Sequence, residues 1–534
     1  RKKLQVIICV LLVELFERFT FFGIVCNMIL FCTVKLGYDN YLAATVNLCF
    51  IGASTLTPVL VGWFAETCLG RTKVLYLCAV LHFFTAMLPV VAFPFEDFYI
   101  DTHHMTHQLE PREQQILFYT GLLAAALGIG GIRAILCPMG AYNLQGYNQH
   151  QLLSFFNFYW LVNLNSTIVF LGIAYIQQSV AKNLGFLIPF TSVLLALIAI
   201  HMMRNKLTYK PKKGSLLTTL GVFLNSFKMC CLHYRHLSGD VASWLDRAKE
   251  NNGGRYSETH VENVKVLAKL FPLYGLQLLY RACITQIPSG YYIQTMNSNL
   301  HLNDLLLPIG AMNVISILPV LLLAPLMECV TTCYLSMEKT PLAPAKIILG
   351  HVCATLSVLV AGLSELQRKT YPLVEQTLSG KVLQVSSMPC FQLAPQYILL
   401  GLAEALVTPA SLISFQLTPS HIRGISLHFL TLSYGGGCFL GAFIVQLVYF
   451  LSGNFYPSML HDGNLERFFF LLATLMAINT LVFWSVSYYI DLSVRGKALT
   501  LSPLTEKLRH YKAFLRFYDT VDRSYTNTSF ESIL

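Results

Sequence analysis

The sequence predicts an all-α membrane protein whose helices cross a bilayer many times. Hydrophobic residues make up 55% of the 534-residue chain and charged residues only 12%, and the mean hydropathy is +0.56. A soluble domain of this length does not need so much apolar sequence. The apolar residues are also gathered into long runs, each able to span the roughly 30 Å hydrocarbon layer as a helix.

Twelve such runs follow one another, six on each side of a polar segment. The first six predicted helices cover about 4–34, 41–66, 74–97, 116–138, 155–180 and 186–203. The second six cover about 264–296, 305–329, 345–366, 394–417, 424–451 and 466–490. This is the layout of two parallel repeats. We therefore expect an N-terminal six-helix bundle over 1–203 and a C-terminal six-helix bundle over 263–490.

The polar segment 204–262 contains ten Lys and Arg residues and is expected to be a cytosolic linker, with a cytosolic tail over 491–534. Because basic residues lie mainly between the apolar runs, the net charge of +10 fits the positive-inside rule better than binding to nucleic acid. An even number of spans, together with basic residues at both ends of the chain, predicts that both termini lie in the cytosol. An amphipathic helix against the membrane is one expectation for the linker, near Trp244.

The first apolar run contains three ionisable residues, Glu14, Glu17 and Arg18. On a helix their spacing places them on roughly one face. A charge that faces lipid costs several kcal/mol, so this face should point into a bundle or a wet cavity. Two carboxylates beside one guanidinium leave one Glu unpaired, which is what a proton-carrying group needs. The alternative is a buried ion pair that only locks helices together.

Two further ionisable residues lie deep inside apolar runs, Arg133 and Glu404. Snorkelling to an interface is the alternative for Arg133, but the residue lies far inside its run. Three histidines between 103 and 107 have metal-binding atoms but no ordered scaffold, so we favour a solvated loop and predict no metal. No nucleophile–base pattern indicates an enzyme.

The stretch from Glu14 to Phe22 reads Glu-x-x-Glu-Arg-Phe-x-Phe-Phe. It resembles the first-helix signature Glu-x-x-Glu-Arg-Phe-x-Tyr-Tyr of the proton-coupled oligopeptide transporter family. The stretch from Phe158 to Ser166 resembles the second signature, Phe-Tyr-x-x-Ile-Asn-x-Gly-Ser, with Asn165 at the Gly position. The resemblance covers all twelve runs and is closest to the peptide/histidine branch of solute carrier family 15. It implies a major facilitator superfamily fold and symport driven by protons, with no other cofactor.

The loop after the second run resembles the Gly-x-x-x-Asp-x-x-x-Gly-Arg loop of major facilitator transporters. The matching residues are Gly62, Glu66 in the acidic place, Gly70 and Arg71. An acid at a helix end and a basic turn can clamp two helices in one state of a rocking transporter. We expect a gating or structural role for this loop.

The resemblance also implies roles for individual residues. Glu14, Glu17 and Arg18 would couple protons and form part of a site for the substrate carboxylate. Arg133 occupies the position of a family Lys that helps to bind this carboxylate. The positions expected to contact a small peptide, histidine or related zwitterion are Phe21, Phe22, Arg133, Tyr159, Trp160, Asn163, Gln286, Gln294, Asn313 and Glu404.

The chain departs from the family pattern at several of these positions. Phe21 and Phe22 replace Tyr, and Arg133 keeps its proton where a Lys could exchange one. The family's Gly-Leu-Glu-Phe, whose Glu captures a peptide amino terminus, is replaced by the acid-free stretch 411–415. A missing counter-charge for an ammonium costs several kcal/mol, which disfavours ordinary di- and tripeptide transport at high affinity. Glu404 either replaces this acid or is a structural partner.

Two alternatives follow from these departures. One is a transport-deficient membrane scaffold or sensor of the same fold, with cytosolic adaptors on the linker or tail. The other is a carrier for an anionic, non-peptide solute. In the tail, 511–514 and 518–521 both fit the Tyr-x-x-bulky form read by sorting adaptors. The motifs do not distinguish between the plasma membrane and the endolysosomal membrane as the location of the protein.

Overall fold

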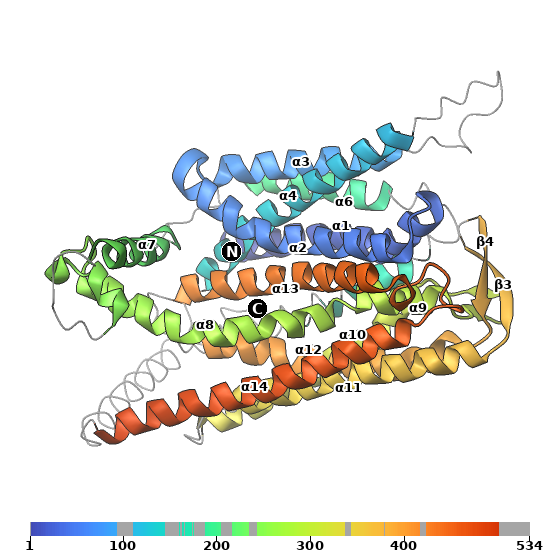
Figure 1. Ribbon diagram of the computed structural model, residues 1–534. Coiled ribbons are helices and arrows are strands. Elements are labelled where there is room, and N and C mark those ends of the chain that lie inside the picture. The colour runs from blue at the N-terminus through green and yellow to red at the C-terminus, as the bar shows by residue number, and fades with distance from the viewer. Residues whose placement is uncertain are drawn as a thin grey trace.

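The structure is a computed structural model, and it describes residues 2–92, 111–144, 160, 163–164, 166–173, 175, 187–203, 216–233, 243–336, 343–378, 380–416 and 423–500. Within these residues the chain forms a bundle of long helices that lie side by side (Figure 1). The first helices are α1 (Lys2–Leu30) with the π-turn η1 (Phe31–Lys35), α2 (Asn40–Phe64) with η2 (Ala65–Leu69), α3 (Arg71–Ala92), α4 (Pro111–Leu144), η3 (Val169–Ile173) and α6 (Leu187–Met203).

The later helices are α8 (Glu258–Ile284), η8 (Ile287–Tyr291), α9 (Tyr292–Met296), α10 (Ala311–Ser336), α11 (Ala343–Thr370), η9 (Cys390–Leu393), α12 (Ala394–Gln416), α13 (Arg423–Leu451), η10 (Gly453–Phe455) and α14 (Leu465–Thr500). Two antiparallel hairpins pair β1 (His301–Leu302) with β2 (Leu305–Leu306) and β3 (Leu373–Leu378) with β4 (Lys381–Ser386). Among the described residues, seven helices are long and apolar enough to cross a membrane.

The linker contains more helix than the sequence indicates. α7 (Leu216–His233) precedes two 3₁₀ turns, η6 (Trp244–Ala248) and η7 (Glu250–Asn252). An amphipathic helix was expected near Trp244, but Trp244 begins a 3₁₀ turn and the longer helix lies earlier in the chain. In Figure 1, α7 and the β3–β4 hairpin lie at opposite ends of the bundle.

The helices pack in two groups that meet along α2 and α13. α1, α2, α3, α4 and α6 pack against one another, and α8 and α10 to α14 form the second group. Glycines allow α2 and α13 to approach closely, because a Cβ atom on Gly435 would lie 2.4 Å from Leu56, and one on Gly52 would lie 2.9 Å from Phe439. At this seam between α2 and α13, the backbone of a glycine on one helix therefore lies directly against a side chain of the other helix.

Polar contacts between the two groups gather where α2 begins. Asn40 Nδ2 donates hydrogen bonds to the carbonyl oxygens of Pro457 at 3.0 Å and Ser458 at 3.2 Å. The rings of Tyr41 and Tyr449 stack with centroids 3.6 Å apart. These contacts hold the two groups together at this end of the bundle.

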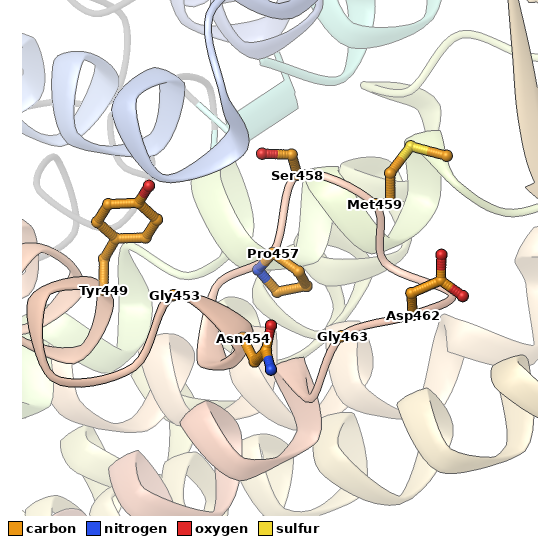
Figure 2. Close-up of a pocket in the computed structure, with 8 residues that line it drawn as sticks. All are labelled: Tyr449, Gly453, Asn454, Pro457, Ser458, Met459, Asp462 and Gly463. Carbon is orange, nitrogen blue, oxygen red and sulfur yellow. The ribbon is translucent and has the colours of Figure 1, made fainter.

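A pocket of about 280 Å³ lies in the loop between α13 and α14 at the same end. Figure 2 shows Tyr449, from the last turn of α13, and Ser458, from the loop, pointing toward the N-terminal helices, and Ser458 Oγ donates to Asp39 Oδ1 at 2.8 Å. The pocket is lined by Tyr449, Gly453, Asn454, Pro457, Ser458, Met459, Asp462 and Gly463. It belongs to the contact between the groups, and no buried ionisable side chain discussed below lines it.

Candidate functional site

Glu17 is the centre of a buried charge cluster in the first group of helices. Its side chain comes from α1 and only 1% of the residue is exposed. Glu17 Oε1 accepts a hydrogen bond from Arg133 Nε of α4 at 3.0 Å, and Glu17 Oε2 lies 3.8 Å from Arg18 Nε. The fold thus brings a second guanidinium to the motif. The side chain of Glu14 lies outside the described residues.

Phe21 forms a platform for Arg133. The guanidinium carbon of Arg133 lies 4.4 Å from the centroid of the Phe21 ring, within the range of a cation–π interaction. Phe21 in turn stacks on Phe50 of α2, with centroids 6.1 Å apart and an interplanar angle of 21°. Phe22 packs on Phe170 of η3 at 5.4 Å. The aromatic ring at position 21, rather than a tyrosine hydroxyl, therefore orients the cation.

His82 of α3 is an ionisable residue near this cluster that the sequence reasoning did not single out. It is 1% exposed, and neither ring nitrogen has a hydrogen-bond partner among the described residues. It packs against α4, since a Cβ atom on Gly128 would lie 2.8 Å from His82 Cβ. The imidazole ring of His82 is also close enough to Arg133 for the positive charge of the guanidinium to act on it. The only sequence signal was a single histidine inside an apolar run.

A second charged cluster lies in the other group of helices. The charges of Arg281 on α8 and Glu404 on α12 are close enough to interact, although these two described residues do not form an ion pair within 4.0 Å. The guanidinium carbon of Arg281 lies 5.3 Å from the ring centroid of Tyr434 on α13. Gly437 makes room for Arg281, because a Cβ atom there would lie 2.5 Å from Arg281 Cβ. Sequence reasoning gave Arg281 and Tyr434 no role.

The guanidinium group of Arg281 does not use all of its hydrogen-bond donors within the described residues. Its Nε atom is buried and donates no hydrogen bond to the described residues. Arg281 and Glu404 are both half-buried rather than fully enclosed. The two groups of helices therefore each present a guanidinium and a carboxylate.

Gln294 was expected to contact substrate, but the structure places it in a buried network. Gln294 Nε2 donates to Glu365 Oε2 of α11 at 3.0 Å, and its Oε1 accepts from Gln396 Nε2 of α12 at 2.8 Å. Glu365 also pairs with Arg368 at 2.6 Å, and all four side chains are almost fully buried. Gln294 therefore joins three helices here and offers no free polar atom to a substrate.

Gln286 and Asn313 also make contacts within their own group of helices. Gln286 is 1% exposed and its Nε2 donates to the carbonyl oxygen of Ala282 at 3.2 Å. Asn313 Nδ2 of α10 donates to the hydroxyl of Tyr292 at 3.2 Å. Gln286 Oε1 accepts no hydrogen bond among the described residues, so it retains a free acceptor.

The expected contacts from the 155–180 run are only partly described. Trp160 is 37% exposed, and its Nε1 donates to the carbonyl oxygen of Leu321 on α10 at 3.2 Å, which links the two groups. Asn163 is half-buried and its carbonyl oxygen accepts from Thr167 at 3.1 Å. Tyr159 lies outside the described residues.

The loop between α2 and α3 has the backbone that its glycine predicts. Gly70 has φ +80° and ψ 152°, a conformation that other residues adopt only with strain, and Arg71 begins α3 directly after it. Gly62 is different, because a Cβ atom there would meet only Ala134 at 4.0 Å. The side chain of Glu66 lies outside the described residues.

Metal-ligand patterns are not found in the described part of the chain, where no group of three His, Cys, Asp or Glu side chains could hold an ion. The histidines of 103–107 and the tail motifs of 511–521 lie outside the described residues.

Comparison with known proteins identifies the family. A model of the POT family, named PTR2, matches residues 88–457. Human solute carrier family 15 member 5 is 55% identical over 97% of this chain and 91% of its own length. Mouse solute carrier family 15 member 3 is 26% identical over 90% of each chain.

Solved structures of the family share the fold. An auto-inhibited POT family peptide transporter superposes with a TM-score of 0.68 at 16% identity, over 90% of this chain and 96% of its own. A POT family transporter in complex with 5-aminolevulinic acid gives a TM-score of 0.65 at 17% identity, over 91% and 96%. The predicted fold class is confirmed, and the relatives are transporters rather than enzymes. The chain therefore belongs to the POT family of multi-pass membrane transporters, within solute carrier family 15, and has its all-α, twelve-helix major facilitator fold.

Proposed function

We propose that the protein is a proton-coupled symporter that moves small peptides, histidine or a related small zwitterion by alternating access. The observation that carries the proposal is the buried Glu17, whose two carboxylate oxygens face Arg133 and Arg18. A carboxylate held between two cations inside a membrane bundle is a group whose proton occupancy changes the charge available to a substrate.

The charge balance explains how a proton and a substrate would be coupled. Glu14 and Glu17 balance Arg18 and Arg133 when both acids are ionised. Protonation of Glu17 removes the charge that pairs with Arg133 and leaves the guanidinium fork able to bind a substrate carboxylate. Loss of the proton restores the 3.0 Å pair and displaces the carboxylate. Because Arg133 does not lose its own proton, only a Glu carries the coupling proton.

Glu404, in the other group of helices, is a negatively charged partner for the ammonium group of a zwitterion. An ammonium at Glu404 and a carboxylate at Arg133 would bridge the two groups, which favours a state closed around the substrate. The relative solved with 5-aminolevulinic acid supports a small zwitterion of this kind, since that molecule has one amine and one carboxylate. Arg281 beside Glu404 weakens the negative pole, so affinity for amines is expected to be modest.

The contacts between the two groups are consistent with alternating access. The hydrogen bonds of Asn40 and the stack of Tyr41 on Tyr449 close the end where α2 begins. If the N-terminus is cytosolic, as the charge distribution predicts, this end faces away from the cytosol. Opening this end of the bundle would break these contacts while the two groups of helices rotate about the seam between α2 and α13.

The test is uptake of labelled histidine, a dipeptide and 5-aminolevulinic acid into liposomes with an imposed acid-outside gradient. Wild type is compared with Glu17→Gln and with Glu113→Gln, a matched change at an exposed residue in the first turn of α4. We expect gradient-driven uptake by wild type and Glu113→Gln, and at least a tenfold loss in Glu17→Gln.

Two outcomes would overturn parts of this proposal. Gradient-driven uptake that survives in Glu17→Gln would leave transport in place but remove Glu17 from the coupling path. No uptake of any of the three compounds by folded wild-type protein would contradict symport of small zwitterions, and would favour the scaffold reading or the anion carrier below.

An anion carrier is the second candidate, and Arg281 favours it. With Arg18 and Arg133, it makes three guanidinium groups in the two charged clusters around Glu17 and Glu404, while the acid of the family's Gly-Leu-Glu-Phe stretch is missing. A site richer in positive charge favours anionic solutes. Competition of a non-peptide dicarboxylate, succinate, and of Ala-Ala against labelled substrate tests this candidate, with Arg281→Gln as the variant. A preference for succinate that Arg281→Gln abolishes would support it, and stronger competition by Ala-Ala would contradict it.

A further inference from the structure

The buried face of α7 attaches this helix to the start of α8. Val222 is fully buried in a cluster with Leu245, Ala248 and Val261. Ser226, one turn further on, is also fully buried and donates to the carbonyl oxygen of Leu245 at 3.2 Å. α7 is therefore a fixed part of the linker and presents one defined face outward.

The outward face of α7 is an apolar stripe. Leu217, Leu220, Leu224 and Phe227 are 53%, 45%, 70% and 65% exposed. Their spacing of three, four and three residues places them on one side of the helix, and four residues further the exposed Cys231 continues the same line. These five residues are named the α7 stripe. Four large apolar side chains in register on one exposed face indicate a surface that is covered in the native setting.

Ring contacts place α7 at the depth where the membrane begins. Phe223 of α7 stacks on Phe271 of α8 at 5.5 Å, and Phe271 packs on Phe429 of α13 at 5.1 Å. Phe429 lies at the start of the apolar span His428–Leu451. Trp244, 49% exposed, lies 6.0 Å from Phe223, and tryptophan is enriched at membrane–water boundaries. The α7 stripe therefore lies beside the boundary between water and hydrocarbon.

The charges around α7 match an anionic lipid surface. Five of the ten Lys and Arg residues of 204–262 fall between 204 and 213, just before the helix, and the exposed Lys228 lies next to Phe227. Basic residues beside an amphipathic helix attract the negative headgroups of the cytosolic leaflet. The α7 stripe is therefore matched to a membrane surface.

We propose that α7 rests on the cytosolic leaflet through its stripe and that Cys231 is a site of S-acylation. In this reaction the Cys231 thiolate attacks the carbonyl carbon of a long-chain fatty acyl-CoA. A thioester forms on Sγ, and coenzyme A leaves as its thiol, taking the proton that Cys231 gave up. Exposed cysteines on amphipathic helices next to membranes are typical acceptors of this modification. The adjacent Cys230 is also exposed but lies off the stripe. The proposal depends on a cytosolic linker, and not on transport activity.

The experiment uses the full chain expressed in cultured cells, with thioester-linked acyl groups cleaved by hydroxylamine and the freed thiols captured on resin. The variants are Cys231→Ser, Cys230→Ser and, as a matched control, Cys68→Ser at another exposed cysteine. We expect capture of wild type, Cys230→Ser and Cys68→Ser, and at least a fivefold loss in Cys231→Ser. Leu224→Glu, which keeps both cysteines but puts a charge in the stripe, is expected to lower capture at least threefold while size-exclusion profiles stay unchanged.

Absence of hydroxylamine-dependent capture of the wild-type protein would overturn the proposal. So would equal capture in Cys231→Ser, or full capture in Leu224→Glu, since the first removes the acceptor and the second the membrane contact. A loss confined to Cys230→Ser would show that the stripe does not select the acylated residue, and would also overturn the assignment to Cys231.

Discussion

Glu17 and Arg133 lie 116 positions apart in the chain, and their side chains meet at 3.0 Å inside the bundle. This contact joins α1 to α4 and places a proton-binding group against the cation proposed to bind substrate. Because Glu17 is fully buried and the Arg133 side chain is only 13% exposed, a change in one leaves the other without its counter-charge in a poorly solvated place. The pair is therefore the most sensitive point of the proposed mechanism.

Arg133→Ala is expected to reduce substrate uptake by at least about tenfold, since removing one partner of a desolvated charge pair costs about 2–5 kcal/mol. Arg133→Lys keeps the positive charge but not the planar fork, so it should retain part of the uptake. Initial rates in proteoliposomes over a range of substrate concentrations measure both variants. Wild-type kinetics in Arg133→Ala would remove this residue from the site.

Phe21→Leu is expected to lower thermal stability and raise KM, because it removes a cation–π contact worth about 0.5–2 kcal/mol. Phe21→Tyr keeps the ring and serves as the matched control, with values close to wild type. Thermal unfolding in detergent and uptake kinetics give the two readouts. If Phe21→Leu and Phe21→Tyr behave alike, the ring does not orient Arg133.

Gly70→Ala is expected to destabilise the protein by about 1–3 kcal/mol, because the backbone at this position has φ +80° and ψ 152°. Gly62→Ala in the same motif should be tolerated, as the added methyl group would meet only Ala134 at 4.0 Å. Thermal unfolding of both variants separates backbone strain from packing. Equal stability of the two would argue against strain at Gly70.

The linker should lose structure in acid, because its carboxylates are stabilised in the ionised form. Hydrogen bonds from Lys249 at 2.7 Å and Lys265 at 3.0 Å hold the pKa of Glu262 below its usual range. Burial of Asp246 opposes ionisation, but hydrogen bonds from Lys265 and Lys249 outweigh it and lower the pKa of Asp246. Stability from such groups is present above their unfolded pKa values, near 4, and is lost as the pH falls through the folded values.

Limited proteolysis of the linker at pH 7 and below pH 4 tests this expectation, using an acid-active protease at low pH. Asp246→Asn should increase cleavage at pH 7 and flatten the pH dependence, whereas Glu250→Gln, at an exposed residue outside the cluster, should change neither. The effect is expected to be modest, since partly exposed pairs contribute about 0–1 kcal/mol each. Acid-independent cleavage of wild type would contradict it.

Hydropathy was sufficient to place most helices. The predicted 394–417 and 424–451 correspond to α12 at Ala394–Gln416 and α13 at Arg423–Leu451, because apolar length follows from the bilayer as solvent. The predicted helix 264–296 ends where α9 ends, but it is interrupted, because Pro288 and Gly290 fall in a π-turn between α8 and α9. Hydropathy also missed α7, because the apolar stretch Leu217–Cys231 is shorter than a membrane span and lies between polar parts of the linker.

The sequence by itself determined the class of protein, the family and the presence of ionisable residues at membrane depth, since these depend on composition and local motifs. Only the tertiary structure decided which residues meet. It pairs Glu17 with Arg133, places Arg281 beside Tyr434, and buries Gln294 against Glu365. Contacts between helices far apart in the chain depend on how the helices pack, and single-sequence periodicity does not record that packing.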